Sequence, residues 1–342
     1  MIHAPVVVAH DEFVEASPAF EEAPVSPTAA SSPTGSSLAA PANPLARYTR
    51  CKRLRSTLYG ETALYQDEAL GRKLVVLKRL SISALQKEDS SSVHENPLCE
   101  RAVIRMLEDP LIARAAGREH VVSYEREAMF THEDNVYVAM EFCAGGDLYD
   151  YVTGKPLRRL QEVEALGLFA QIASGLGFLH HHGVAHRDLS LENVLLQGGQ
   201  VKICDFGLST DGNVLSDDAV GKFYYMAPEV SQGVHYDPKK ADVWSLGVML
   251  FIMLTGSPLF ADEAPRAPTL RVLAKYGVGK ILELWHLKRQ FSRQTVNLLA
   301  CLLQVQPQHR LTIEQVLRHP ALRAFGPLRV PVGTSGMAAP SA

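Results

Sequence analysis

Three oxygen-bearing side chains lie near one another in the segments HRDLSLENVLL and VKICDFGLS. They are Asp188, Asn193 and Asp205, and short strand-like runs border the loops that carry them. One carboxylate can orient a hydroxyl group and accept its proton, while a second carboxylate and an amide oxygen are hard ligands of the kind that Mg²⁺ prefers. Because transfer of a phosphoryl group needs both functions, we predict that these two loops form a phosphoryl-transfer site.

The first half of the chain is predicted to supply a small sheet and one helix. Between Tyr48 and Tyr137 the β-rich runs are short, and a single helical stretch separates them. The expected strands are LYGETALYQ, KLVVLKRL, VVSYEREAMF and NVYVAMEF, and the expected helix is PLCERAVIRML.

After CAGGDLYDYV the pattern becomes helical. Apolar residues recur at spacings of three and four, and Gly183 is placed to end that helix; these residues are Leu166, Phe169, Ile172, Leu176 and Leu179. The segment ADVWSLGVMLFIMLTG is apolar on every face, which predicts a buried helix beginning near Asp242, with Asp242 in the N-cap position.

A hydrophobic content of 46% in 342 residues is enough to form a large core. Residues 1–46 differ, because they hold seven prolines and five acidic residues but no lysine or arginine. Such a segment buries too little apolar surface to offset its ordering entropy. We therefore predict a disordered acidic tail at 1–46, a domain at 47–325 with lobes at 47–142 and 143–325, and a flexible C-terminal tail at 326–342.

The charge and the cysteines narrow the partners and the location. A net charge of −3 offers no basic surface for nucleic acid or for an acidic membrane, so we expect neither as a partner. The five cysteines are scattered without C-x-x-C spacing, and no secretory signal opens the chain. These features favour a cytoplasmic location, with the nucleus as the alternative.

Together the motifs resemble those of the eukaryotic protein kinases, over roughly Tyr48 to Phe325. The matches follow that family's order: VVLK ending at Lys78, a helix carrying Glu100, the segment MEF, His186-Arg187-Asp188 with Asn193, Asp205-Phe206-Gly207, Ala227-Pro228-Glu229, DVWSLG and PQHRLTIEQVLRHP. The resemblance implies an α+β, bilobal fold with a small β-rich N-terminal lobe and a larger, mostly helical C-terminal lobe.

The resemblance also implies a role for each matching residue. Lys78 would bind the α- and β-phosphates of ATP, with Glu100 as its ion-pair partner and Glu95 as the weaker alternative. Asp188 would orient the substrate hydroxyl, while Asn193 and Asp205 would hold Mg²⁺.

The remaining implied roles concern adenosine and the fold. Met140 would line the back of the adenine pocket, the backbone of Glu141 and Cys143 would bond the adenine edge, and Asp147 would meet the ribose or a basic substrate residue. Arg310 would form a buried ion pair with Glu229.

Two residue types are exchanged relative to the serine/threonine-specific members of that family. Those members carry lysine at the position of Ser190 and threonine at the position of Lys222, and the two positions face each other in the family fold. Our hypothesis is a reciprocal exchange, in which the Lys222 ammonium replaces the missing one beside Asp188. The alternative is that Lys222 is a solvated loop cation and that Ser190 is a tolerated loss.

A second departure lies in the glycine-rich loop that the family places before Lys78. The segment RLRSTLYGETALY offers Arg55, Thr57 and Gly60 at that loop's glycine positions. Glycine lets backbone amides approach phosphates closely. We therefore expect Gly60 to contact the nucleotide, and the other two side chains to crowd it and weaken ATP binding.

A third departure concerns regulation. In the family, a phosphorylated residue in the activation segment pairs with the arginine at the position of Arg187, and Asp218 stands there in this chain. Its carboxylate is a candidate substitute for that phosphate. The alternative is a mobile acidic loop that an upstream kinase phosphorylates at Ser209, Thr210 or Ser216.

We therefore expect a protein kinase that uses ATP and Mg²⁺ to phosphorylate serine or threonine in protein substrates, a preference that YYMAPE favours. The first alternative is a pseudokinase, a scaffold or allosteric regulator with weak or no catalysis, which the poor glycine loop favours. The second is a small-molecule phosphotransferase, which would not need the segment APE.

Overall fold

The computed structural model describes residues 43–87, 95–260 and 266–323, all within one structural unit that begins at Asn43. The C-terminal tail expected at 326–342 and nearly all of the N-terminal tail lie outside the described residues.

The first described residues, 43–46, lie within the segment predicted as a tail. Pro44–Arg47 form a 3-10 turn, η1, in which the Asn43 side chain accepts a hydrogen bond from the Leu45 backbone. The Arg47 Nε atom lies 3.1 Å from both oxygens of the buried Asp67 carboxylate. This charge-assisted bond ties the turn to the sheet.

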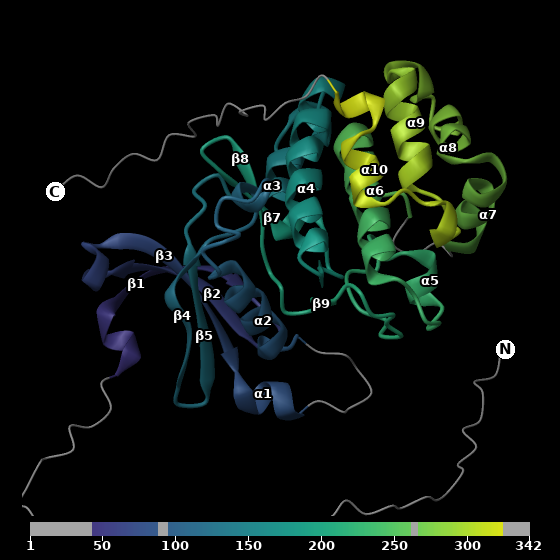
Figure 1. Ribbon diagram of the computed structural model, residues 1–342. Coiled ribbons are helices and arrows are strands. Elements are labelled where there is room, and N and C mark those ends of the chain that lie inside the picture. The colour runs from purple at the N-terminus through teal and green to yellow at the C-terminus, as the bar shows by residue number, and fades with distance from the viewer. Residues whose placement is uncertain (1–42, 88–94, 261–265, 324–342) are drawn as a thin grey trace, which may run out of the picture. The chain divides into compact units, whose positions relative to one another are not determined.

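The N-terminal lobe is a five-stranded antiparallel sheet with helices at its side (Figure 1). In spatial order the strands are β1 Tyr48–Ser56, β2 Gly60–Asp67, β3 Lys73–Ser81, β5 Asn135–Glu141 and β4 Tyr124–His132. Its helices are α1 Ile82–Lys87 and α2 Pro97–Leu107. The predicted strand runs at 73–80 and 135–142 and the predicted helix at 97–107 are confirmed, whereas β1 was not predicted.

The sheet register places the predicted lysine on the face that looks toward the other lobe. Lys78 pairs with Thr62 on β2 and with Val138 on β5, and Val76 pairs with Met140. Side chains two residues apart on a strand share a face. Lys78 therefore emerges beside Val76 and Met140, and all three line the same cavity.

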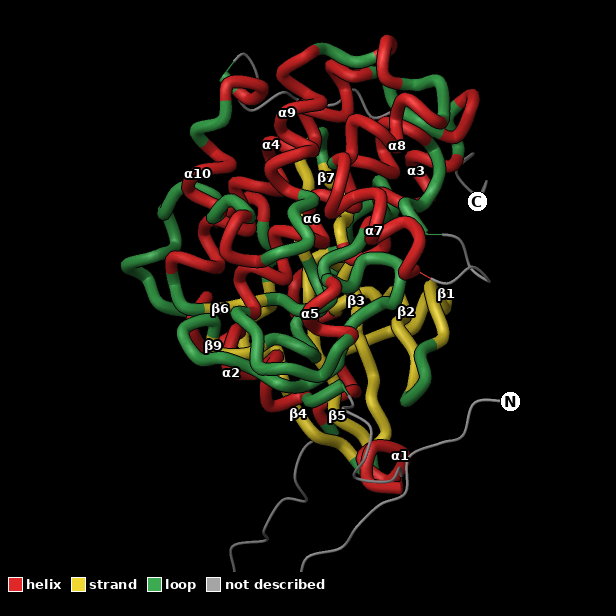
Figure 2. The backbone as a smooth tube through the Cα atoms, turned by 90° about the vertical axis from the view of Figure 1, so that its right-hand side faces the viewer, coloured by secondary structure: helices red, strands yellow, loops and turns green. Residues whose placement is uncertain are grey.

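The C-terminal lobe is mostly helical, and in Figure 2 most of its helices lie above the five-stranded sheet. Its helices are α3 Leu148–Thr153, α4 Glu162–His181, α5 Pro228–Ser231, α6 Pro238–Thr255, α7 Arg266–Tyr276, α8 Val278–Leu284, α9 Arg293–Leu302 and α10 Ile313–Leu317. Its short strands are β6 Val184–Ala185, β7 Val194–Gln197, β8 Gln200–Ile203 and β9 Thr210–Asp211. Further 3-10 turns are η2 Glu68–Leu70, η3 Arg118–His120, η4 Pro156–Arg158, η5 Leu191–Asn193, η6 Lys288–Gln290, η7 Pro307–His309 and η8 Pro320–Leu322.

The helices α4 and α6 form the centre of this lobe. The apolar stripe predicted for α4 is buried in the core, and the helix ends at His181, just before Gly183. By length and apolar character α4 could cross a membrane, but 72% of its most apolar window is buried inside the protein. It is therefore a core helix.

The start of α6 differs from the prediction. The helix begins at Pro238, and its N-cap is Asp237, whose side chain accepts hydrogen bonds from the backbone of Lys239 and Lys240. Asp242 lies one turn inside the helix and is buried. The Asp-Pro pair is a stronger start signal than a lone aspartate, because proline is favoured at the first helical position.

Candidate active site

A cavity of about 390 Å³ lies between the sheet of the N-terminal lobe and the loops of the C-terminal lobe. Most of the predicted site residues line it: Lys78, Met140, Glu141, Cys143, Asp147, Asn193 and Asp205. Segments far apart in the sequence thus meet at one place, as the motif order predicted.

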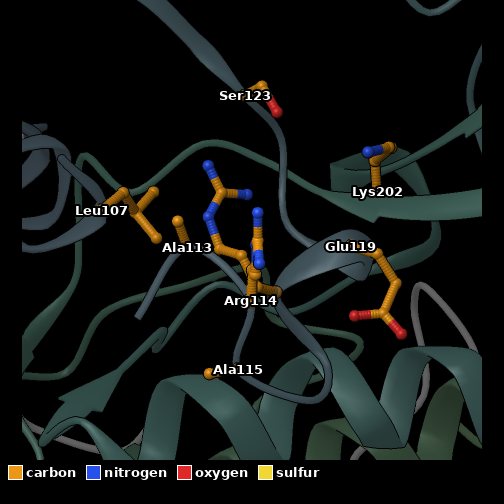
Figure 3. A pocket seen from close by; sticks show the side chains of 8 residues that line it. Leu107, Ala113, Arg114, Ala115, Glu119, Ser123 and Lys202 are labelled. Carbon is orange, nitrogen blue, oxygen red and sulfur yellow. The ribbon is translucent and has the colours of Figure 1, made fainter. Parts of the chain in front are cut away.

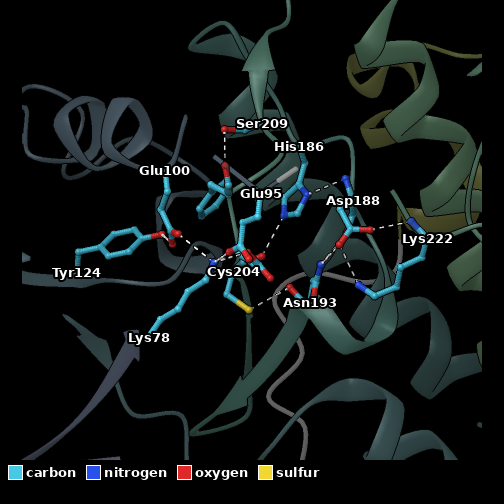
Figure 4. Close-up of polar contacts among 12 residues, drawn as sticks. Lys78, Glu95, Glu100, Tyr124, His186, Asp188, Asn193, Cys204, Ser209 and Lys222 are labelled. Carbon is cyan, nitrogen blue, oxygen red and sulfur yellow. Dashed lines mark hydrogen bonds and ion pairs between the residues drawn. The ribbon is translucent and has the colours of Figure 1, made fainter. Parts of the chain in front are cut away.

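Lys78 stands at the centre of an ion-pair cluster (Figure 4). Its Nζ atom donates hydrogen bonds to Glu100 Oε2 at 3.1 Å and to Asp205 Oδ1 at 2.8 Å, and it also pairs with Glu95. Burial alone would lower the pKa of Lys78, but the three carboxylates hold that pKa well above its usual range. Burial would raise the pKa of Asp205, yet the ion pair and hydrogen bond with Lys78 lower it to about 2. Both groups are therefore charged at neutral pH.

The two glutamates left open by the sequence both contact Lys78, but they are held differently. Glu100 is fully buried in α2, and its Oε1 atom accepts a hydrogen bond from the Tyr124 hydroxyl at 3.0 Å. Glu95 precedes the helix, and burial raises its pKa. Glu100 is thus the fixed partner and Glu95 an additional one. Tyr124 was not predicted, because no motif marks it.

The position of α2 is coupled to the segment that carries Asp205. The Asn96 side chain caps the helix by accepting a hydrogen bond from the Leu98 backbone at 2.9 Å. The Asn96 backbone N–H donates to the Gly207 carbonyl at 2.8 Å. A shift of α2 would therefore disturb both ends of the bridge between Glu100 and Asp205.

The loops that carry Asp188 and Asp205 leave two oxygens available to a cation. The Asn193 side-chain amide donates to both the backbone oxygen and Oδ2 of Asp188, each at 2.8 Å. This orientation turns Asn193 Oδ1 away from Asp188. Within the described residues, neither that atom nor Asp205 Oδ2 accepts a hydrogen bond. Both residues line the cavity, and their hard oxygens suit Mg²⁺.

Asp242 of α6 anchors the loop that carries Asp188, a role that the sequence did not predict. Its carboxylate accepts backbone hydrogen bonds from His186 and Arg187 at 2.8 Å each and lies 2.8 Å from His180 Nε2. Arg187 has φ of +63°, a conformation that costs a non-glycine residue about 1 kcal/mol or more. The buried carboxylate holds the loop in that conformation beside Asp188.

The structure brings Ser190 and Lys222 together, as the exchange hypothesis expected. The Lys222 Nζ atom lies 2.9 Å from Asp188 Oδ2 and 2.9 Å from Ser190 Oγ (Figure 4). The Lys222 backbone N–H also donates to Asp188 Oδ1 at 2.9 Å. The ammonium is therefore bonded to the central carboxylate and to the serine that stands where the family has lysine, rather than to solvent alone.

Arg187 pairs with the activation segment. Its Nη1 atom donates to Asp218 Oδ2 at 2.7 Å and to Ser216 Oγ at 3.0 Å, and its Nε atom donates to the Leu208 carbonyl at 2.7 Å. The Tyr236 hydroxyl fixes the Asp218 backbone with a hydrogen bond at 2.8 Å. Asp218 thus occupies the position expected for a phosphate substitute.

The prediction for the glycine-rich loop needs correction at Gly60. Gly60 is the first residue of β2 and does not line the cavity. A side chain there would meet the Arg79 carbonyl oxygen at 1.9 Å, so the close approach of β3 requires this glycine. Arg55 and Thr57 do line the cavity, and Arg55 reaches across it to Asp147 at 3.5 Å.

The segment APE is anchored as expected. The Arg310 Nη1 and Nη2 atoms lie 2.7 and 3.1 Å from the two carboxylate oxygens of Glu229, and both residues are buried. A bidentate pair of this kind fixes the end of the activation segment against the large lobe.

Comparison with known proteins agrees with this geometry. Residues 65–322 match the model of the protein kinase domain. The chain is also 34% identical, over 281 residues, to the carbon catabolite-derepressing protein kinase of Candida albicans. That alignment covers 81% of this chain but 41% of the relative, so the chain spans about two fifths of that protein's length. On the family match and on the site geometry, the chain belongs to the protein kinase family.

Proposed function

We propose that the chain is a protein serine/threonine kinase that transfers the γ-phosphoryl group of ATP to a hydroxyl group of a protein substrate. One observation carries this proposal: Lys78, Asn193 and Asp205 line one cavity, and Asp188 is bonded to Asn193 at its edge. Membership of the protein kinase family supports the same function.

The residues fit the substrate ATP and the metal that the family generally uses. Lys78 would bind the α- and β-phosphates, displacing Glu95, which lacks the Tyr124 hydrogen bond that holds Glu100. Asn193 Oδ1 and Asp205 Oδ2 would hold Mg²⁺, which supplies neutralisation of phosphate charge. The segment from Met140 to Cys143 would bind adenine, and Asp147 would meet the ribose.

Asp188 would position the substrate hydroxyl and accept its proton. Its Oδ2 atom is already fixed by Asn193 and Lys222, so the carboxylate has a defined orientation before substrate binds. Lys222 would place a positive charge beside the transferring phosphate, the function that lysine at position 190 has in related kinases. The segment YYMAPE after Lys222 favours serine and threonine as substrates.

The pseudokinase alternative rests on Arg55 and Thr57, which line the cavity where the family has glycines. It requires that these side chains prevent nucleotide binding. We favour the enzyme, because Lys78 already donates hydrogen bonds to both Glu100 and Asp205, the arrangement that catalysis needs. We also propose a cytoplasmic location, on the basis of the scattered cysteines.

The test is phosphorylation of serine- and threonine-containing peptide arrays by the full chain with labelled ATP and Mg²⁺. The wild-type chain should transfer label and Asp188→Asn should lose about 10³-fold or more in rate. EDTA should abolish transfer. Binding of MgATP without any transfer in wild type would support the pseudokinase, and label transfer to tyrosine alone would reject the substrate class.

A further inference from the structure

A second cavity of about 390 Å³ lies next to the N-terminal end of β4 and shares no lining residue with the first (Figure 3). Its walls come from the end of α2, the turn before β4 and the strand β8. They are Leu107, Ala113, Arg114, Ala115, Arg118, Glu119, Ser123 and Lys202. None of these residues takes part in the proposed transfer reaction.

Positive charge exceeds negative charge on these walls. Three cationic side chains line the cavity with one carboxylate, that of Glu119, and a second carboxylate, that of Glu141, lies beside Lys202. The Glu119 carboxylate accepts a hydrogen bond from the Gly117 backbone at 3.0 Å. In Figure 3 the Glu119 carboxylate points away from Ser123 and Lys202. It therefore does little to neutralise the cations on the opposite wall.

Each of the three cations keeps capacity for an anion. Arg118 is partly buried, and burial lowers its pKa although the Glu141 carboxylate opposes this shift. Its one side-chain hydrogen bond within the described residues goes to the Val121 carbonyl at 2.9 Å. Arg114 makes no hydrogen bond or ion pair with the described residues. Lys202 lies 3.4 Å from Glu141 Oε1, an oxygen that also accepts the Ser123 backbone N–H at 2.7 Å.

We infer that this cavity binds a phosphate group, brought either by a free phosphate ion or by a phosphorylated side chain. A partly desolvated guanidinium that is not hydrogen-bonded to a carboxylate is energetically costly, and an oxyanion reduces that cost. The guanidinium groups of Arg114 and Arg118 can each donate two parallel hydrogen bonds to phosphate oxygens, and Lys202 adds a point charge. The Ser123 side chain supplies a hydroxyl donor at the same wall.

Arg114 is the residue to substitute, because it is exposed and its loss leaves no described partner unpaired. The matched control is Arg101, an exposed arginine in α2 that lines neither cavity. Isothermal titration calorimetry on the full chain would measure binding of inorganic phosphate and of the tripeptide Gly-phosphoserine-Gly. Binding at the nucleotide site is common to all variants and therefore cancels in the comparison.

Arg114→Ala should weaken phosphate binding at this site by about tenfold, and Arg114→Glu should abolish it, whereas Arg101→Ala should change it by less than about twofold. Tighter binding of the phosphotripeptide than of inorganic phosphate would identify a phosphorylated side chain as the ligand, and the reverse order would identify the free ion. Equal affinity in wild type and Arg114→Ala, or an equal loss in Arg101→Ala, would overturn the inference. Crystals soaked in tungstate give a second readout: anomalous density in the cavity supports the site, and density only elsewhere rejects it.

Discussion

Replacing Lys222 with alanine removes the one cation that touches both Asp188 and Ser190 among the described residues. The charge on the Lys222 ammonium and a unit charge on the transferring phosphate, if about 4 Å apart, would interact by about 4 kcal/mol at an effective dielectric constant of 20. The Lys222 side chain is 36% exposed, so solvent screens part of this interaction and we take about half, about 2 kcal/mol. Because each 1.36 kcal/mol is tenfold in rate, Lys222→Ala should lower kcat by about 30-fold.

The loop itself should survive this substitution. The Lys222 backbone N–H bonds Asp188 Oδ1 at 2.9 Å, and alanine keeps that bond. The matched control is Lys280→Ala, because Lys280 is 39% exposed and pairs with Glu283 far from the cavity. Steady-state kinetics with a peptide substrate should show kcat and kcat/KM falling together in Lys222→Ala, since the lost interaction acts in the transition state.

If Lys222 acts through its charge, moving that charge to position 190 should restore activity, whereas a purely structural role of Lys222 would not allow this rescue. In Ser190→Lys combined with Lys222→Thr, the ammonium returns to the same place from the other loop, and at least about tenfold of the lost rate should be recovered. Loss of less than threefold in Lys222→Ala, or the same loss in Lys280→Ala, would refute a catalytic charge at position 222. A thermal unfolding scan on each variant separates lost catalysis from lost folding.

Three further outcomes follow from the same site. Wild-type protein treated with a phosphatase should stay active, whereas Asp218→Ala should lose about tenfold in activity, because the Asp218 carboxylate holds the activation segment in place of a phosphate. If phosphatase treatment of the wild-type protein caused the same loss of activity as Asp218→Ala, that result would contradict this reasoning. Arg55→Gly should lower the KM for ATP by about threefold or more, since it removes a side chain from the cavity, and an unchanged or higher KM would show that Arg55 assists binding. Burial raises the pKa of Cys143 to about 12 and that of Cys204 well above its usual range. Iodoacetamide at pH 8 should therefore label the exposed Cys51 before either buried thiol, which peptide mass spectrometry would show. Labelling of Cys143 or Cys204 before Cys51 would contradict the burial argument.

The parts of the fold that the sequence predicted are those whose residues are buried in a regular pattern. The strand β3 is a short run in which the residues from Val75 to Lys78 are all buried, and α4 carries apolar residues at helical spacing. The site residues were found because Asp188, Asn193 and Asp205 are near one another in sequence as well as in space. In these segments the local sequence pattern and the contacts in the folded protein indicate the same structure.

The missed parts depend on contacts between distant segments. Residues Tyr48–Ser56 of β1 are almost all exposed, so no apolar alternation marks a strand, and pairing with β2 alone defines it. Asp242 meets the loop at His186 and Arg187 only after α6 packs beneath it. Tyr124 reaches Glu100 only once the sheet and α2 are assembled. No single stretch of sequence contains these relationships.

Two of the three departures from the family pattern have different physical consequences, and this difference bears on whether the chain is an enzyme or a pseudokinase. At Ser190 the missing ammonium is supplied by Lys222 from another segment, so the charge that transfer needs is still beside Asp188. At the glycine loop, Arg55 lines the nucleotide cavity in place of a family glycine and pairs with Asp147 across it. We therefore expect the first departure to leave the chemical step intact and the second to weaken ATP binding before that step. The chain should therefore show ordinary kcat with a high KM for ATP, whereas a pseudokinase would show no turnover at any ATP concentration.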